Sequence, residues 1–138
     1  MAKKILVVDD EAHILHVVSL KLQNAGFEVS TAADGEEALE LAEADPPDLI
    51  ITDFHMPVMN GVELCRALRA NEALKDIPAV ILTARGYALE PEDMDQAGIR
   101  TVLSKPFSPR GLLATVHEVL NDAAGLAGDV EASVSDLE

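Results

Sequence analysis

The sequence predicts an α/β fold: a five-stranded parallel sheet, doubly wound by helices in a (βα)5 order. Three observations predict it. Short apolar runs recur five times along the 138 residues, four of them do not alternate apolar and polar positions, and a stretch with helical spacing follows most runs. Strands without alternation are typical of parallel sheets, whose two faces are both buried. Right-handed crossovers then place helices on both faces.

The first half of the chain holds two strand–helix pairs. The apolar run at 5–8 is the first expected strand, and the more polar stretch FEVST at 27–31 is the second. Helical spacing predicts the two helices, with apolar positions at Ile14, Val18 and Leu22, then at Ala38, Leu41 and Ala42. A glycine ends the first helix and a pair of prolines the second. Asp34 with Glu37 three residues later resembles a capping box at the start of the second helix.

The second half of the chain holds three more pairs, with strands expected at 49–51, 79–82 and 101–103. Helical positions follow the first and the last of these strands, at Leu64, Cys65 and Leu68, then at Leu112, Leu113, Val116, Val119 and Leu120. Ser108 before Pro109 is typical of a capped helix start. The remaining helix is expected to start near Pro91 and to be short, because few apolar positions follow that proline.

Composition excludes several classes of protein. Against 10 Lys and Arg there are 25 Asp and Glu, a formal net charge of -15, which is the wrong sign for holding nucleic-acid phosphates. We therefore expect no direct nucleic-acid binding. No apolar run approaches the roughly 20 residues of a membrane span or suits a signal peptide, so we expect no membrane contact and a cytoplasmic location. The lone Cys65 can form no internal disulfide and is expected to be a small apolar residue on a helix.

The chain divides into one domain and a tail. Residues 1–124 suffice for a single core. Residues 125–138 hold two glycines, four acids and no base, so they are expected to be an acidic, disordered tail.

Chemically active residues follow the predicted strands. Ligand sites of open parallel sheets lie at the carboxyl ends of the strands. Asp9 and Asp10 follow the first strand, Asp53 the third, Thr83 the fourth and Lys105 the fifth. Each has a simpler alternative, as a helix cap, a turn residue, a loop hydroxyl or a solvated surface charge. A complementary set at every inner strand end favours a shared site, and the adjacent carboxylates need a positive group beside them.

The chemistry of this set points to a divalent ion and a phosphoryl group. Carboxylate oxygens without cysteine or clustered histidine suit Mg²⁺ or Mn²⁺, which keep coordination positions for water and phosphate. A carboxylate beside such an ion can attack phosphorus and form an aspartyl phosphate, and Asp53 is best placed to do so. Lys105 and the hydroxyl of Thr83 suit phosphoryl oxygens.

The motifs ILVVDDE, GEEALEL, PDLIITDFHMPVMNG, IPAVILTA and LSKPF resemble, in this order, the receiver domains of two-component response regulators of the chemotaxis-regulator type. The resemblance covers about residues 3–122. Separations agree as well as letters: 43 residues from Asp10 to Asp53, 30 from Asp53 to Thr83 and 22 from Thr83 to Lys105. It implies a flavodoxin-like sheet with strand order 2-1-3-4-5.

The resemblance also implies a role for each site residue. Asp53 would accept the phosphoryl group. Asp10, Asp53 and the backbone carbonyl of His55 would bind Mg²⁺, and Asp9 would act on the ion through water. Thr83 and Lys105 would hold the phosphoryl oxygens, and the Lys105–Pro106 peptide would be cis.

One position departs from the family pattern. Receivers usually carry an aromatic residue three positions before the lysine, and here that residue is Val102. Tyr87 is a possible substitute, although a surface aromatic is the simpler explanation for it.

The implied function is signalling. The phosphoryl donor would be a sensor histidine kinase or a histidine phosphotransfer protein, and the output a contact with a downstream protein. The chain would be no enzyme beyond its own phosphorylation and slow autodephosphorylation. It would be either a stand-alone receiver or a piece of a longer regulator. The acidic fourth helix favours a monomer or a weak dimer.

Two other classes are weighed. A phosphatase of the haloacid dehalogenase type also uses a strand-end aspartate, Mg²⁺ and a lysine, but it needs a second acid two residues after a nucleophile on the first strand. Here Asp9 is followed by Asp10, Glu11 and then Ala12, and such a phosphatase also needs a cap or a larger core. A non-catalytic flavodoxin-like binding module would need a glycine- or hydroxyl-rich loop after the first strand, which is missing.

Overall fold

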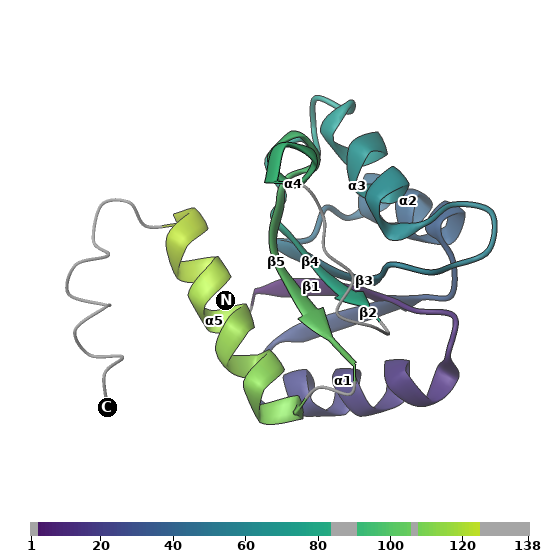
Figure 1. Ribbon diagram of the computed structural model, residues 1–138. Helices are drawn as coiled ribbons and strands as arrows, with labels where there is room; N and C mark the ends of the chain where they lie inside the picture. Colours follow the sequence, from purple (N-terminus) through teal and green to yellow (C-terminus); the bar gives the residue numbers. More distant parts are fainter. Residues whose placement is uncertain (1–2, 84–90, 106–107, 125–138) are drawn as a thin grey trace.

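A computed structural model describes residues 3–83, 91–105 and 108–124 of the chain. Strands and helices alternate throughout (Figure 1): β1 (Lys4–Val8), α1 (Ala12–Asn24), β2 (Glu28–Ala32), α2 (Gly35–Ala44), β3 (Leu49–Asp53), α3 (Gly61–Arg69), β4 (Ala79–Thr83), α4 (Pro91–Ala97), β5 (Ile99–Ser104) and α5 (Pro109–Ala124). All neighbouring strands pair in parallel, in the order β2-β1-β3-β4-β5. The predicted fold and strand order are confirmed. Tyr87, Pro106 and the segment 125–138 lie outside the described residues.

Two apolar layers sandwich the sheet. Helices α1 and α5 cover one face, and α2, α3 and α4 cover the other (Figure 1). Successive strand residues alternate between the layers: Ile50 packs toward α3, whereas Ile51 packs toward α1 and α5. Every residue of β3 and β4 is buried, which explains their continuous apolar runs. None of the helices in the described part of the chain has the length and apolar content that crossing a bilayer requires.

Cys65 behaves as predicted. It is buried in the layer beneath α3, and burial raises the pKa of its thiol to about 12. A thiol in such surroundings is inert.

The fifth strand begins earlier than its apolar run suggests. Helix α4 ends against Gly98, which has a φ of 73° and donates its N–H to the Asp95 carbonyl at 3.2 Å. The strand starts at the next residue, Ile99. Ala79 pairs with Ile99 and Val80 with Thr101, so Arg100 is an extra residue and forms a β-bulge. The strand was expected to start only at residue 101, because the charged Arg100 interrupts the apolar run.

The cap of α2 forms as predicted, except that one of its hydrogen bonds is shifted by one residue. Asp34 accepts a hydrogen bond from the Glu37 N–H at 2.8 Å, as predicted. Glu37, however, accepts from the N–H of Ala33, one residue before the cap, so the box is not closed. A complete capping box starts α3, between Asn60 and Glu63, and it was not among the predicted caps.

The start of α3 packs closely against the end of β3. The Gly61 N–H donates to the Phe54 carbonyl at 2.9 Å. A β-carbon at Gly61 would lie 2.5 Å from the carbonyl oxygen of Asp53. Glycine is therefore required because a side chain would collide with the backbone of β3, and not because of its φ. Its small size lets the start of α3 lie directly against the end of β3.

Replacing Gly61 with alanine is expected to lower the free energy of unfolding by about 1–3 kcal/mol, because backbone must move to admit the methyl group. Urea denaturation measures the change. Gly111→Ala is the matched control. A β-carbon at Gly111 would lie 3.6 Å from its nearest neighbour, the β-carbon of Ser108, and alanine favours a helix. Equal effects of the two substitutions would contradict the close approach at Gly61.

Candidate functional site

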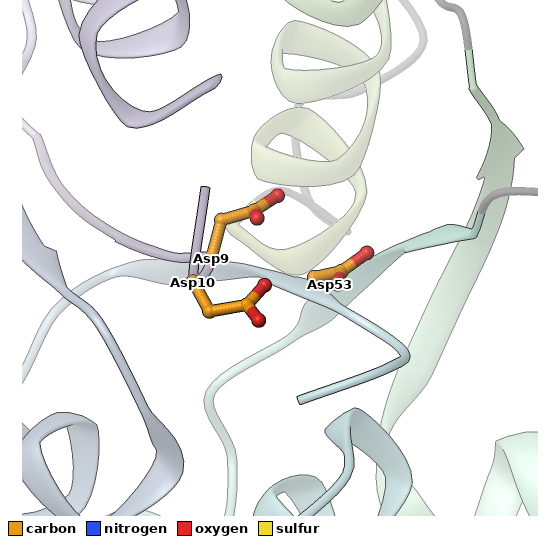
Figure 2. Close-up of side chains that lie close together, drawn as sticks. All are labelled: Asp9, Asp10 and Asp53. Carbon is orange, nitrogen blue, oxygen red and sulfur yellow. The ribbon is translucent and has the colours of Figure 1, made fainter. Parts of the chain in front are cut away.

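Three aspartates gather where β1 and β3 end side by side. Asp9 and Asp10 directly follow β1, and Asp53 is the last residue of β3. One carboxylate oxygen from each lies within 4.8 Å of the other two (Figure 2). Asp9 and Asp53 are buried, whereas Asp10 is exposed to solvent. The expected convergence of the three acids is thus observed.

Lys105 supplies the positive group expected beside them. Its Nζ lies 3.1 Å from Asp9 Oδ2 and 3.1 Å from Asp53 Oδ1. Because β3 and β4 separate β1 from β5, this side chain reaches across the rim of the sheet. It also lies 3.2 Å from Glu11 Oε1, a partner that the sequence did not reveal.

Burial sets the electrostatics of the site. Desolvation raises the pKa of Asp9 and of Asp53, although Lys105 opposes the shift at both carboxyl groups. Burial also disfavours the Lys105 ammonium, but its hydrogen bonds to Asp53 and Asp9 outweigh this effect and raise its pKa. One fixed cation therefore faces two buried carboxylates and the exposed Asp10, which leaves the site with excess negative charge.

The hydroxyl of Thr83 lies at the neighbouring strand end. Thr83 is the last residue of β4, its carbonyl accepts from the Lys105 N–H at 2.6 Å, and its side chain is buried. Its Oγ1 has no hydrogen-bond partner within the described residues. A buried polar atom without a partner favours a missing ligand. Thr52, by contrast, donates its hydroxyl to the Asp53 carbonyl at 3.0 Å.

The donor set fits a hard divalent cation. The clustered side chains offer carboxylate oxygens, and neither cysteine nor histidine joins the group among the residues that the structure describes. Oxygen ligands of this kind suit Mg²⁺ or Mn²⁺.

The loop after Asp53 carries local strain. Val58 has a φ of 73° and is 87% exposed. The Met59 N–H donates to the Pro57 carbonyl at 2.7 Å and closes a γ-turn around it. A β-branched residue in this region is strained, and sequence spacing gave no sign of it. His55 lies just before this turn, exposed, with its ring edge against Phe54 at a centroid distance of 4.7 Å.

Val102 occupies the position where receivers usually carry an aromatic side chain. It is partly buried and packs against the layer formed by α2, α3 and α4. It does not reach the acidic cluster through any contact that the structure records. The proposed substitute, Tyr87, lies outside the described residues.

Fold and site together define a class: a doubly wound α/β domain with acids, a hydroxyl and a lysine at the carboxyl ends of its inner strands. The chain belongs to the family of response regulator receiver domains, because the sequence model of that family matches residues 5–117. It is the receiver domain of a two-component response regulator, a signalling module rather than a catalytic enzyme. This assignment gives no support to a haloacid dehalogenase phosphatase.

Relatives agree with this assignment. The chain is 38% identical over 138 residues to the alkaline phosphatase synthesis transcriptional regulatory protein PhoP of Bacillus subtilis, covering 100% of this chain and 57% of that protein. It is 37% identical to the phosphate regulon transcriptional regulatory protein PhoB of Pseudomonas aeruginosa, and the match covers 97% of this chain and 58% of that protein. The chain thus spans little more than half the length of these relatives.

A solved structure matches nearly end to end. The chemotaxis response regulator CheY4 of Vibrio cholerae is 41% identical, with a TM-score of 0.80, and the match covers 86% of this chain and 99% of that one. The core fold therefore coincides with that of a chemotaxis receiver.

Replacing Asp53 with asparagine is expected to raise the free energy of unfolding at neutral pH when divalent ions are chelated, because it removes a desolvated charge. The pKa of Asp53 in the folded state lies above its ordinary value of 3.8. Protonation therefore stabilises the fold at low pH, and this stabilisation is lost as the pH rises through the folded pKa. The advantage of Asp53→Asn should accordingly shrink as the pH falls toward about 4.

Chemical denaturation across this pH range measures the effect. Asp76→Asn, at an exposed carboxylate, makes the same change in net charge and serves as the control. A gain in Asp53→Asn that equals the control's gain, or that grows on acidification, would contradict the account.

Proposed function

We propose that the chain accepts a phosphoryl group on Asp53 from a sensor histidine kinase or a histidine phosphotransfer protein, and that Mg²⁺ is required. The observation that supports this proposal most directly is the contact of the Lys105 ammonium with both buried carboxylates, those of Asp9 and Asp53. Lys105 contacts the buried carboxylate of Asp53 at the end of a central strand, beside an acidic cluster of oxygen donors. A nucleophile, a cation and a metal-binding set then meet at one point, as transfer of a charged phosphoryl group requires.

The residues divide the chemistry among them. A carboxylate oxygen of Asp53 would bond to phosphorus while the phosphorus–nitrogen bond of the donor breaks and the donor imidazole leaves. Lys105 would move from carboxylate partners to a phosphoryl oxygen, as a compact point charge can. Thr83 would donate its hydroxyl to a second oxygen, and the absence of a partner for this hydroxyl among the described residues supports the role.

Metal binding follows from the same geometry. Asp10, Asp53 and the backbone carbonyl of His55 would hold Mg²⁺ directly, and Asp9 would act through water. The exposure of Asp10 supports its direct role. Asp9 is already engaged, since it accepts from the Glu11 N–H at 2.9 Å and from Lys105 at 3.1 Å. The ion supplies charge that neutralises the phosphoryl oxygens.

We further infer that residues 1–124 form the complete receiver unit and that 125–138 are a tail dispensable for phosphorylation. The output would be a contact with a downstream protein in the cytoplasm, and the domain would act as a monomer or weak dimer. Its acidity, a formal charge of -15, opposes direct contact with nucleic acid. The only reactions it would promote are its own phosphorylation and slow dephosphorylation.

Incubation with acetyl phosphate and Mg²⁺ is expected to add about 80 Da to the protein, the mass of one phosphoryl group. Intact-mass spectrometry measures the product, and a chelator should prevent it. Asp53→Asn should abolish it. Asp76→Asn, at an exposed acid, should retain it. Persistence of the added mass in Asp53→Asn would refute the assignment of the acceptor.

Replacing Asp10 with asparagine is expected to weaken Mg²⁺ binding by about tenfold or more, because a direct carboxylate ligand is lost. Asp9→Asn should have a smaller effect, since Asp9 is held by Lys105 and would reach the ion through water. Titration of Mg²⁺ followed by calorimetry compares the two variants. Equal losses, or a larger loss in Asp9→Asn, would overturn this division of roles.

A further inference from the structure

A second cluster of charge lies at the opposite rim of the sheet. All strands are parallel and the acidic cluster lies at their carboxyl ends, so the turn between α4 and the start of β5 lies at the other rim (Figure 1). A cavity of about 580 Å³ opens there, between the end of α3, α4 and the first residues of β5. Arg69 and Arg100 both line it.

Two local features place these arginines at the cavity. The side chain of Arg69 lies across Gly98: a β-carbon at that glycine would lie 3.0 Å from Nη1 and 3.2 Å from Cδ. The glycine that ends α4 with a φ of 73° therefore also makes room for a guanidinium. Arg100 is the extra residue of the β-bulge, and bulges redirect side chains at sheet edges.

Neither arginine forms a close ion pair with a carboxylate among the residues that the structure describes. Within the described residues, no carboxylate oxygen is recorded within 4.0 Å of either guanidinium. Asp95 lines the same cavity but makes no ion pair with them at that distance. In a chain with 25 acids and 10 bases, two arginines line this one cavity, and neither has a carboxylate partner among the described residues. Two like charges that line one cavity favour an anion between them.

We propose that this cavity is an anion-binding site, which takes a small molecule with two or more phosphate or carboxylate groups. The planar forks of the two guanidiniums suit bidentate contact with either group. The cavity has the volume of small-ligand sites. Partly buried Met94 and the buried side chain of Ile99 add an apolar wall for the body of such a ligand. This inference is independent of the phosphoryl chemistry proposed for Asp53.

Inorganic pyrophosphate and citrate are the probes, one for each source of anionic groups. Divalent ions are removed beforehand by dialysis, with no chelator left in the buffer, so that the acidic cluster at the other rim repels both probes. Each probe is titrated into the whole chain, and amide resonances are followed by NMR. We expect saturable shifts that are larger at Gly98 and Arg100 than at Asp9 and Asp53, and weaker binding at higher salt, because exposed charges are screened. Saturation by one probe alone would identify its group as the preferred ligand.

Arg69→Gln and Arg100→Gln are each expected to weaken binding by about tenfold or more, since each removes a charge-assisted contact. Arg110→Gln is the matched control. It removes the same charge from an exposed residue in the first turn of α5, at the acidic rim, and should change binding less than about twofold. Arg100→Lys keeps the charge but not the fork, and should give an intermediate loss if Arg69→Gln fails to fold. The absence of saturable binding by either probe in the millimolar range, or equal binding in all these variants, would overturn the proposal.

Discussion

The ammonium of Lys105 is the interaction on which the rest of the site depends. Asp9 and Asp53 are both buried, and two neighbouring carboxylates in a low-dielectric setting repel each other. Lys105 contacts both at 3.1 Å and is itself largely covered. Losing the cation would leave uncompensated buried charge, a change that typically destabilises a protein by about 3–5 kcal/mol. The charge left over after this pairing is what makes the cluster attractive to a divalent cation.

The opposite rim shows the converse arrangement. There the turn at Gly98 and the bulge at Arg100 place two cations at one cavity without a carboxylate partner among the described residues. One β-strand, β5, therefore joins two sites of opposite charge, with Arg100 near its start and Lys105 just past its end. The extended backbone of the strand keeps Arg100 and Lys105 at opposite rims of the sheet. The charges at one rim therefore do not neutralise the charges at the other.

Most of the fold could be predicted from local patterns. Apolar runs marked the buried strands because both faces of a parallel sheet are covered, and Asp34 marked a helix start because its side chain caps the next turn. The positions of the acids followed from strand ends alone. The sequence did not reveal three features: the pairing of Lys105 with Glu11, the positive φ of Val58 and the bulge at Arg100. No spacing rule encodes these features: the ion pair joins residues far apart in sequence, the bulge depends on pairing with β4, and the φ of Val58 belongs to a tight turn that its residue type does not mark.

The reach of Lys105 across the sheet has a consequence for protein synthesis. Its partner Asp9 lies 96 residues earlier in the chain. A nascent polypeptide emerging from the ribosome therefore exposes the acids of β1 and β3 long before their cation is made. Until β5 has joined the sheet, the carboxylates lie in water without the lysine, and the last strand to be translated is the one that brings their cation to them. A chain that is released before Lys105 is added lacks the cation, so its buried carboxylates have no lysine to pair with.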